Sequence, residues 1–324
     1  MIYKIITIYF LFIFEFVSAQ QNHPVDAKVL AYPKSFSSIG KLTERIQYDF
    51  QTDYDKARAV YVWVANTITY DLKAKSNPKV ITIESKSTYE FEQKYNRLKI
   101  KRINKTFRSK KGVCQHYSEL YQAIAEKVGL KVQLLSGNAK TTPNQIGRSS
   151  KMSNHAWNAV WANDRWMLVD ATWGSGYTLT DENKFVKEYN DFYFDTPPSL
   201  FFKQHFPETG KWLNQVLDRN SYESYPLYYS FFSKKGIELD PDIGIIGANE
   251  GDTIQLKIKN IIYSEAIKLG KKEIIPLQFI PFNQEDNFVA FEFVYSRKQG
   301  RYITIYINEN PFAVIKIIPK KAKT

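Results

Sequence analysis

The chain has 324 residues and a formal net charge of +12, and 44% of its residues are hydrophobic. This length is sufficient for two domains with sizeable cores, and the apolar content excludes a wholly disordered chain. The single cysteine excludes an internal disulfide and a structural zinc site built from several thiolates. The positive charge favours acidic partners but carries no information about the fold.

Residues 1–19 have the pattern of an export signal. Lys4 precedes a short apolar run over residues 5–14, and small residues before Gln20 offer a cleavage site. The run is too short to span a bilayer comfortably, and Glu15 interrupts it, so we expect no stable membrane span after signal removal. A retained anchor is the alternative interpretation. The sequence therefore predicts a secreted or periplasmic protein.

Helical patterns begin after an irregular segment. Residues 20–41 have no clear period and are predicted to be an extended lead-in. Apolar residues at helical spacing then start at Leu42. A stronger helical pattern follows Asp53, which is a plausible N-cap. These two segments predict packed helices that carry no chemistry of their own.

Residues 73–111 are unusually basic. One interpretation is a solvated face or loop, and the other is a basic rim that attracts acidic substrates and helps to stabilise a thiolate. The segment lacks the interleaved aromatic residues of a single-strand nucleic-acid site, so we expect no nucleic-acid partner. Acidic partners at the cell envelope remain the expectation for this surface. Its cations are Lys94, Arg97, Lys99, Lys101, Arg102, Lys105, Arg108, Lys110 and Lys111.

The only cysteine, Cys114, stands at the start of a helical pattern that Gly129 ends. A lone cysteine is more often a buried small hydrophobe than a reactive group. A helix N-terminus, however, lowers the pKa of a thiol, and an imidazolium partner lowers it further. Cys114 is therefore a candidate nucleophile if a histidine lies close to it.

A β-hairpin is predicted around the Asn-Asp pair at 163–164, with aromatic-rich strands on both sides. With a two- or four-residue loop, His155 lies opposite Thr172 and Asp170 lies opposite Trp157. Alternation then places all four on one face of the hairpin. His155 and Asp170 become diagonal neighbours about 7–8 Å apart, within reach of a hydrogen bond between their side chains. A three-residue loop would break this parity.

These residue types suit acyl transfer. Cys114 would attack a carbonyl carbon, His155 would act as its base, and Asp170 would fix the tautomer and orientation of the imidazole. The backbone N–H of Cys114 is a candidate donor to the oxyanion. Further candidates for substrate binding or for the oxyanion are Gln115, His116 and Trp157.

The remaining histidines offer no metal site by their spacing, and the chain has no glycine-rich phosphate loop. We therefore expect no metal and no organic cofactor. His205 lies in an aromatic segment over residues 185–233, where short helices are predicted with a break at Pro197–Pro198. Beyond about Asp240, alternating apolar residues and regular turns predict short strands.

Three segments resemble the core motifs of the transglutaminase-like superfamily: residues 111–115, 154–160 and 166–174. The resemblance covers roughly residues 42–235 and points to the kyphoscoliosis-peptidase-like branch, whose members often carry β domains after the core. It implies an α+β fold, with a papain-like core in which the cysteine helix packs on an antiparallel sheet. A small β-sandwich of the immunoglobulin or fibronectin type is predicted over residues 240–324.

The resemblance also implies the roles of Cys114 as nucleophile, His155 as general base and acid, and Asp170 as orienting residue. His116 departs from the family pattern, which commonly has glycine there, so the surface beside the thiol is bulkier. We predict an exported cysteine protease, amidase or cross-linking transglutaminase that acts on a protein or peptide substrate. The alternative is a non-catalytic binding or scaffold protein of the envelope, or a cytokinesis-type organiser, because some family members have lost the triad.

Overall fold

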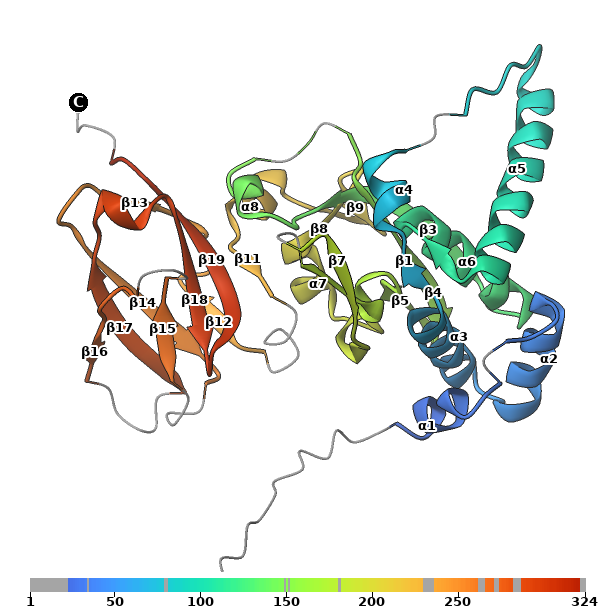
Figure 1. Cartoon of the computed structure of the whole chain (residues 1–324), viewed down its shortest axis with the longest axis horizontal. Coiled ribbons are helices and arrows are strands. Elements are labelled where there is room, and N and C mark those ends of the chain that lie inside the picture. Colours follow the sequence, from blue (N-terminus) through green and yellow to red (C-terminus); the bar gives the residue numbers. More distant parts are fainter. Residues whose placement is uncertain are drawn as a thin grey trace, which may run out of the picture.

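The computed structural model describes residues 23–320 except 34, 79–80, 149, 151, 180–181, 230–235, 262–265, 271–273 and 282–286. The predicted export signal therefore lies outside the described residues. The protein combines helices and sheets in its core and has a β-rich C-terminal region, as predicted (Figure 1). None of the helices in the described ranges has the length and apolarity that a bilayer crossing requires.

The segment predicted as an extended lead-in contains a helix, so that prediction is wrong. Helix α1 (Pro24–Leu30) begins with proline at its first position, and the His23 side chain accepts a hydrogen bond from the backbone of Val25. Seven residues are too few for a visible period, and so short a helix depends on tertiary contacts. Asp26 supplies one of these through a buried ion pair with Arg58.

Three longer helices form most of the core. They are α2 (Ile39–Asp49), α3 (Asp53–Thr67) and α6 (Cys114–Lys127), and all three confirm predicted helices. Helix α3 is buried without interruption from Ala57 to Ala65, so it lies inside the core. Its N-cap is Thr52, one residue before the predicted Asp53, and the Thr52 hydroxyl accepts a hydrogen bond from the third helical residue.

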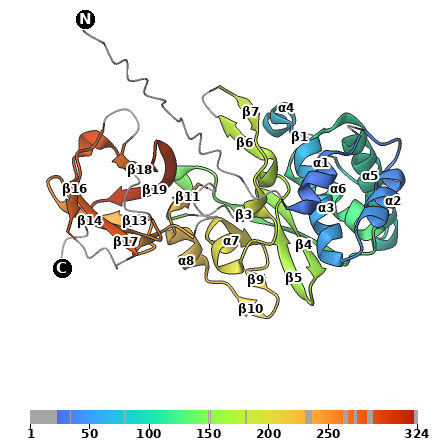
Figure 2. The same ribbon diagram turned by 90° about the horizontal axis from the view of Figure 1, so that it is seen from below.

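A four-stranded antiparallel sheet supports these helices. Its two faces are both buried: Val160 and Met167 contact the helical core, and Trp157 and Leu168 contact a second cluster beneath α7 (Pro198–Gln204). Figure 2 shows α3 and α6 on one side of this sheet and α7 on the other. The strand order is β5 (Arg165–Val169), β4 (His155–Ala162), β3 (Val132–Ala139) and β8 (His205–Pro207).

The predicted hairpin register is confirmed. Strands β4 and β5 pair Asn158 with Val169, and the residues at 163–164 form the two-residue turn, both with left-handed φ values (51° and 56°). The two pairs predicted beyond Val169 do not form, because strand β5 ends there and the Asp170 N–H bonds to the Tyr193 carbonyl instead. The parity nevertheless survives, since His155 and Asp170 still face each other.

The basic segment over residues 88–109 is a long helix, α5 (Thr88–Ser109), rather than a loop. Only its C-terminal half is anchored, by burial of Ile103 and Phe107 and by an ion pair between Arg102 and the buried Glu119 of α6. The rest of the helix projects from the core (Figure 1). Short connecting elements are β1 (Thr69–Tyr70), α4 (Leu72–Ser76), β2 (Lys111–Gly112), β6 (Gly176–Leu179), β7 (Lys184–Lys187), β9 (Lys211–Trp212), β10 (Gln215–Val216) and α8 (Arg219–Ser224).

The C-terminal region has two sheets that enclose one hydrophobic cluster, as the alternating apolar pattern predicts. One sheet contains β12 (Glu238–Asp240), β14 (Thr253–Lys259), β17 (Phe288–Val294) and β16 (Gln278–Ile280). The other contains β11 (Leu227–Tyr228), β19 (Asn310–Ile318), β18 (Tyr302–Ile307), β15 (Ile267–Leu269) and β13 (Ile245–Gly247). The domain limits and the immunoglobulin or fibronectin type remain predictions.

The loop before His155 contacts this C-terminal region. Ile146 is fully buried in a cluster with Leu227 and Val314, and its carbonyl accepts a hydrogen bond from Lys316 Nζ at 2.9 Å. A second connection joins Lys203 of α7 to Asp242 at 2.6 Å. The two regions are therefore connected by both apolar and charged contacts.

Candidate active site

The thiol of Cys114 lies at the first residue of α6 and is half-buried. Val113 is the N-cap, and its backbone N–H donates to Nδ1 of His116 at 2.9 Å. The helix thus begins at the cysteine because His116 satisfies a donor that a helix start leaves without a partner. This geometry directs the positive end of the helix dipole toward the sulfur.

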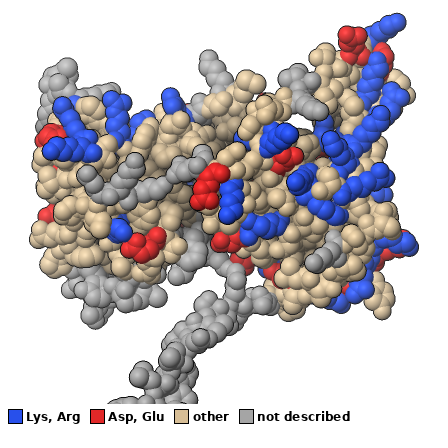
Figure 3. Space-filling model, in the orientation of Figure 1, with Lys and Arg blue, Asp and Glu red and all other residues tan. Residues whose placement is uncertain are grey.

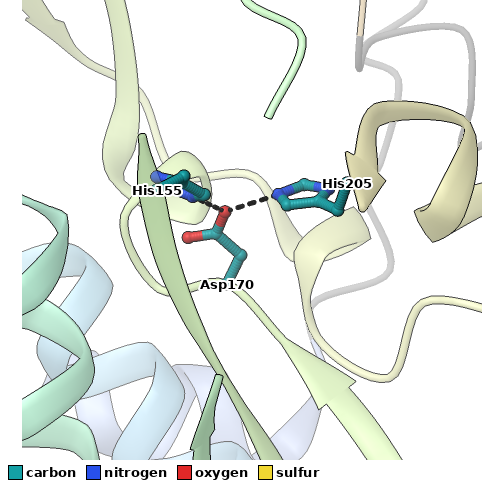
Figure 4. A group of neighbouring side chains, drawn as sticks. All are labelled: His155, Asp170 and His205. Carbon is teal, nitrogen blue, oxygen red and sulfur yellow. Dashed lines mark hydrogen bonds and ion pairs between the residues drawn. The ribbon is translucent and has the colours of Figure 1, made fainter. Parts of the chain in front are cut away.

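His155 and Asp170 form a close pair. His155 lies at the start of β4, and its Nε2 is 2.6 Å from Oδ2 of Asp170 (Figure 4). Its side chain is also hydrogen-bonded to Cys114, which leaves Nδ1 as the ring nitrogen facing the sulfur. The structure therefore brings the three residues predicted as nucleophile, base and orienting group into one continuous series of contacts.

The electrostatics favour an ion pair between sulfur and imidazole. Burial alone would raise the pKa of Cys114, but the hydrogen bond and charge of His155 and the backbone N–H of Ala156 lower it below its ordinary value. Burial likewise opposes the charge on His155, yet the neighbouring Asp170 carboxylate raises its pKa to about 10. At neutral pH these directions favour a thiolate beside an imidazolium.

Asp170 stays ionised although it is completely buried, because its carboxylate accepts four hydrogen bonds. Oδ1 accepts the backbone N–H groups of Thr172 at 2.9 Å and Trp173 at 3.1 Å. Oδ2 accepts from His155, and it also lies 3.1 Å from Nε2 of His205. The pKa of Asp170 is held well below its usual range, because these donors outweigh the effect of burial.

His205 is the residue that sequence reasoning missed. It stands 35 residues after Asp170 in the chain, and its spacing to the other candidates carries no signal. Helix α7 and strand β8 bring it to the site, where β8 pairs with β3 and the His205 ring stacks on Phe201. A weak signal was available in the placement of Phe201 one helical turn before His205, since such pairs often stack.

One group of side chains in the described part of the chain could hold a metal ion, and it consists of His155, Asp170 and His205. Ligand atoms of His155, Asp170 and His205 all lie within 4.8 Å of one another. The spacing of these residues along the chain does not reveal the group. Both imidazoles already direct Nε2 at one carboxylate oxygen, and the 2.6 Å contact is a hydrogen bond with no room for an ion between its atoms. The donor set thus fits a proton network better than a metal site.

The three further candidates for substrate or oxyanion binding, Gln115, His116 and Trp157, lie in different surroundings. Gln115 donates its side-chain amide to Glu119 at 2.9 Å, and His116 is engaged at the helix start. Burial is the main reason that the pKa of His116 is lowered, in agreement with its role as an acceptor. Trp157 is fully buried beside His155, and its Nε1 has no hydrogen-bond partner among the described residues. Their roles toward a substrate remain predictions.

Glycine is required beneath the site. Gly137 of β3 pairs with His155, and a Cβ built on it would lie 2.1 Å from the Phe206 carbonyl and 2.7 Å from the Trp157 ring. Strands β3 and β8 can approach each other here only because position 137 has no side chain. This close approach brings the start of β8, and with it His205, next to the hairpin.

Comparison with known proteins points to the family that the sequence motifs resemble. Residues 40–171 match the model of the transglutaminase-like superfamily. It is 31% identical to the human (Homo sapiens) kyphoscoliosis peptidase and 30% identical to the mouse (Mus musculus) protein, over 219 residues in each case. These relatives support the predicted branch.

The similarity covers 66% of this chain but only 30% of each kyphoscoliosis peptidase, so the chain spans about a third of their length. Hillarin of Drosophila melanogaster is 23% identical over 201 residues, which cover 57% of this chain and 22% of hillarin. The alignment with the crystal structure of a TGase covers 63% of this chain and 45% of the TGase chain, with 15% sequence identity and a TM-score of 0.30. That TM-score is too low to support any conclusion.

Proposed function

We propose that the protein is a cysteine-dependent acyl-transfer enzyme that acts on peptide or carboxamide bonds. The observation that carries this proposal is the unbroken series of contacts from the half-buried Cys114 thiol through His155 to Asp170. A structural cysteine needs neither a helix start nor an imidazole with a raised pKa. The match of residues 40–171 to the transglutaminase-like superfamily supports the same chemistry.

In the proposed reaction, the Cys114 thiolate attacks the carbonyl carbon and a carbon–sulfur bond forms. The carbonyl π electrons move to oxygen, and the backbone N–H of Cys114 at the helix start is a donor available to that oxyanion. His155 gives its proton to the amide nitrogen as the carbon–nitrogen bond breaks, which leaves a thioester on Cys114. Asp170 holds the imidazole in orientation and stabilises its charged form.

Water or an amine then attacks the thioester carbon while His155 accepts a proton from the attacking group. The carbon–sulfur bond breaks, and the Cys114 thiolate leaves and is regenerated beside the imidazolium. Water makes the protein a protease or amidase, whereas a lysine amine makes it a cross-linking transglutaminase. We propose hydrolysis as the main outcome, because water, unlike an amine acceptor, is always available. A panel of peptide amides assayed with and without a primary amine, and read by mass spectrometry, separates the two products.

The decisive experiment is the pH dependence of iodoacetamide labelling, which is unambiguous because Cys114 is the only cysteine. We expect rapid labelling of the wild type well below pH 8.5, and slower labelling of His155→Ala at neutral pH, because the variant loses the imidazolium. The profile of an ordinary thiol in both proteins would contradict the enzyme and favour a binding or scaffold protein. Thermal unfolding of each variant controls for misfolding.

We also propose that the protein is exported and that α5 contacts acidic partners or substrate segments. Arg97, Lys101, Lys105 and Arg108 recur three or four residues apart and so share one face of the helix. None of them has an ion pair within the part of the chain that the structure describes, and a groove of about 540 Å³ lies over this face. Figure 3 shows the blue side chains gathered along α5.

Two measurements test these two points. Export with signal cleavage predicts a mature protein that begins near Gln20 and is recovered outside the cytoplasm; a full-length cytoplasmic protein would refute it. Contact with acidic segments predicts that kcat/KM for an acidic peptide falls with added salt, and that Lys101→Glu with Lys105→Glu removes this dependence. A neutral peptide of equal length is the control. Equal salt sensitivity for both peptides would contradict the role of α5.

A further inference from the structure

Among the histidines, His205 has surroundings that packing alone does not explain. Its side chain is completely buried, yet it directs Nε2 at a charged oxygen, Oδ2 of Asp170, at 3.1 Å (Figure 4). Its ring stacks on Phe201, with 4.0 Å between centroids and an angle of 16°, and the Trp173 ring lies 4.5 Å away. This aromatic enclosure fixes the orientation of the imidazole and therefore the direction of its hydrogen bond.

The carboxylate of Asp170 has about four acceptor positions, and each is occupied. Two are taken by the backbone N–H groups of the turn at 172–173, and these hold only Oδ1. Oδ2 takes His155, and His205 supplies the fourth contact. Without His205, Oδ2 would be held only by the imidazole whose position it is meant to fix.

We propose that His205 is a positioning residue for the reaction: its Nε2–H holds Asp170 Oδ2 so that the carboxylate remains ionised and aimed at His155. This inference rests on the proposed function and adds a fourth member to its hydrogen-bonded series. His205 does not touch the thiol or the substrate in this role. It acts through Asp170, which in turn orients the imidazole that activates Cys114.

The protonation state of His205 follows from its neighbours. Burial lowers its pKa, and the positive charge on His155 acts in the same direction, while the Asp170 carboxylate opposes them. A neutral ring has one N–H. The two acceptors near it are Asp170 at 3.1 Å and the Phe201 carbonyl at 3.3 Å from Nδ1. The shorter, charge-assisted contact takes the proton, so His205 is neutral with hydrogen on Nε2. The other titratable group that faces the ring is Tyr193, whose hydroxyl donates to Gln204.

The test compares two replacements of His205 with a matched packing control. His205→Leu removes the donor, whereas His205→Gln places an amide N–H at similar reach. Phe202→Leu removes a buried ring of α7 that packs against Trp212 rather than against His205. We expect kcat to fall about 10- to 100-fold in His205→Leu with little change in KM, because Asp170 loses a charge-assisted hydrogen bond. Most of this loss should be recovered in His205→Gln, and Phe202→Leu should stay within about 3-fold of wild type.

The pH profile of iodoacetamide labelling gives a readout that a merely structural role would not change. The labelling curve of His205→Leu should move toward higher pH, because a less well-placed Asp170 stabilises the imidazolium less and the thiol pKa rises. Equal losses in all three variants, or an unchanged curve in His205→Leu, would overturn the inference. If the labelling curve of His205→Leu is unchanged while the wild type still labels rapidly below pH 8.5, the proposed function stands and only the role of His205 is refuted.

A different result separates failure of the proposed function from failure of this inference. Should the wild type itself label as an ordinary thiol, the proposed function falls, and the role of His205 is then decided by ¹⁵N NMR of the imidazole nitrogens. A neutral ring with hydrogen on Nε2, lost in His205→Leu, supports the contact with Asp170. A hydrogen on Nδ1 would overturn it.

Discussion

The core and the C-terminal region differ in what they bury. Every buried polar or charged side chain in the described part of the chain lies between residues 26 and 205, whereas the described residues from 236 to 320 bury apolar side chains. Burying a charge is costly unless it is paired, so each such group in the core requires partners. The difference shows that the interior of the core depends on hydrogen bonds between side chains, whereas the side chains that the C-terminal region buries are apolar.

The largest effect on stability is expected at Arg58. Its guanidinium contacts both carboxylate oxygens of Asp26, at 2.6 and 2.7 Å, and both side chains are buried. Arg58→Ala leaves the buried Asp26 carboxylate without its cationic partner, with the Tyr189 hydroxyl still donating to it at 3.0 Å. The replacement should lower the free energy of unfolding by about 3–5 kcal/mol. Tryptophan fluorescence during urea unfolding measures this, because all six tryptophans lie at or before residue 212.

The matched control for Arg58 is an exposed ion pair of the same region. Lys41 lies 2.7 Å from Glu44, and both side chains are exposed. Lys41→Ala should change stability by less than about 1 kcal/mol, because water and salt screen the pair. If Arg58→Ala and Lys41→Ala lowered the free energy of unfolding equally, burial would not determine how much an ion pair contributes to the stability of the core.

An intermediate effect is expected from His155→Gln, and it should depend on pH. The pKa of His155 is raised in the folded protein by Asp170, so its contribution to stability is complete below the unfolded value near 6.5. That contribution is lost as the pH rises through about 10, the folded value. The stability difference between wild type and His155→Gln should therefore shrink by roughly 2–4 kcal/mol between pH 6 and pH 10.5.

Urea unfolding at both pH values measures this difference. A replacement in the C-terminal region that carries no titratable group, such as Val289→Ala, should give the same stability difference at both pH values. A constant difference for His155→Gln would show that the imidazole is not held in its charged form.

The smallest effect is expected within the C-terminal sheets. Ile305 is completely buried in their common cluster, and Ile305→Val removes one methylene group there. This should cost about 1 kcal/mol by calorimetry, with no change in turnover, because no hydrogen bond is disturbed. If Ile305→Val lowered turnover without changing the stability of the core, the two regions would be more closely coupled than their contacts indicate.

The sequence predicts best where a local rule fixes geometry. The pair Asn163 and Asp164 suits a two-residue turn, and this turn determines the strand register and so the face that His155 and Asp170 share. Helix α6 is predicted equally well from local sequence: its apolar stripe begins beside Cys114, and the glycine at 129 stops the helix.

Other elements depend on contacts that no local pattern records. Helix α1 has seven residues, and its ion pair reaches Arg58, which is 32 residues from Asp26. Helix α5 was not predicted because its cations outnumber the few apolar residues that anchor it, Ile103 and Phe107 among them. His205 reaches Asp170 only after β8 has joined the sheet.

The hydrogen bond between Lys316 and the Ile146 carbonyl has a consequence for the timing of folding. Its two residues are 170 positions apart, and Lys316 lies in the last described strand, β19. Because chains are made from the N-terminus, the loop that leads to His155 acquires this anchor only after the 170 positions that separate Ile146 from Lys316 have been made. The thiol is thus translated well before β19, the strand that secures the loop beside the histidine that would activate it.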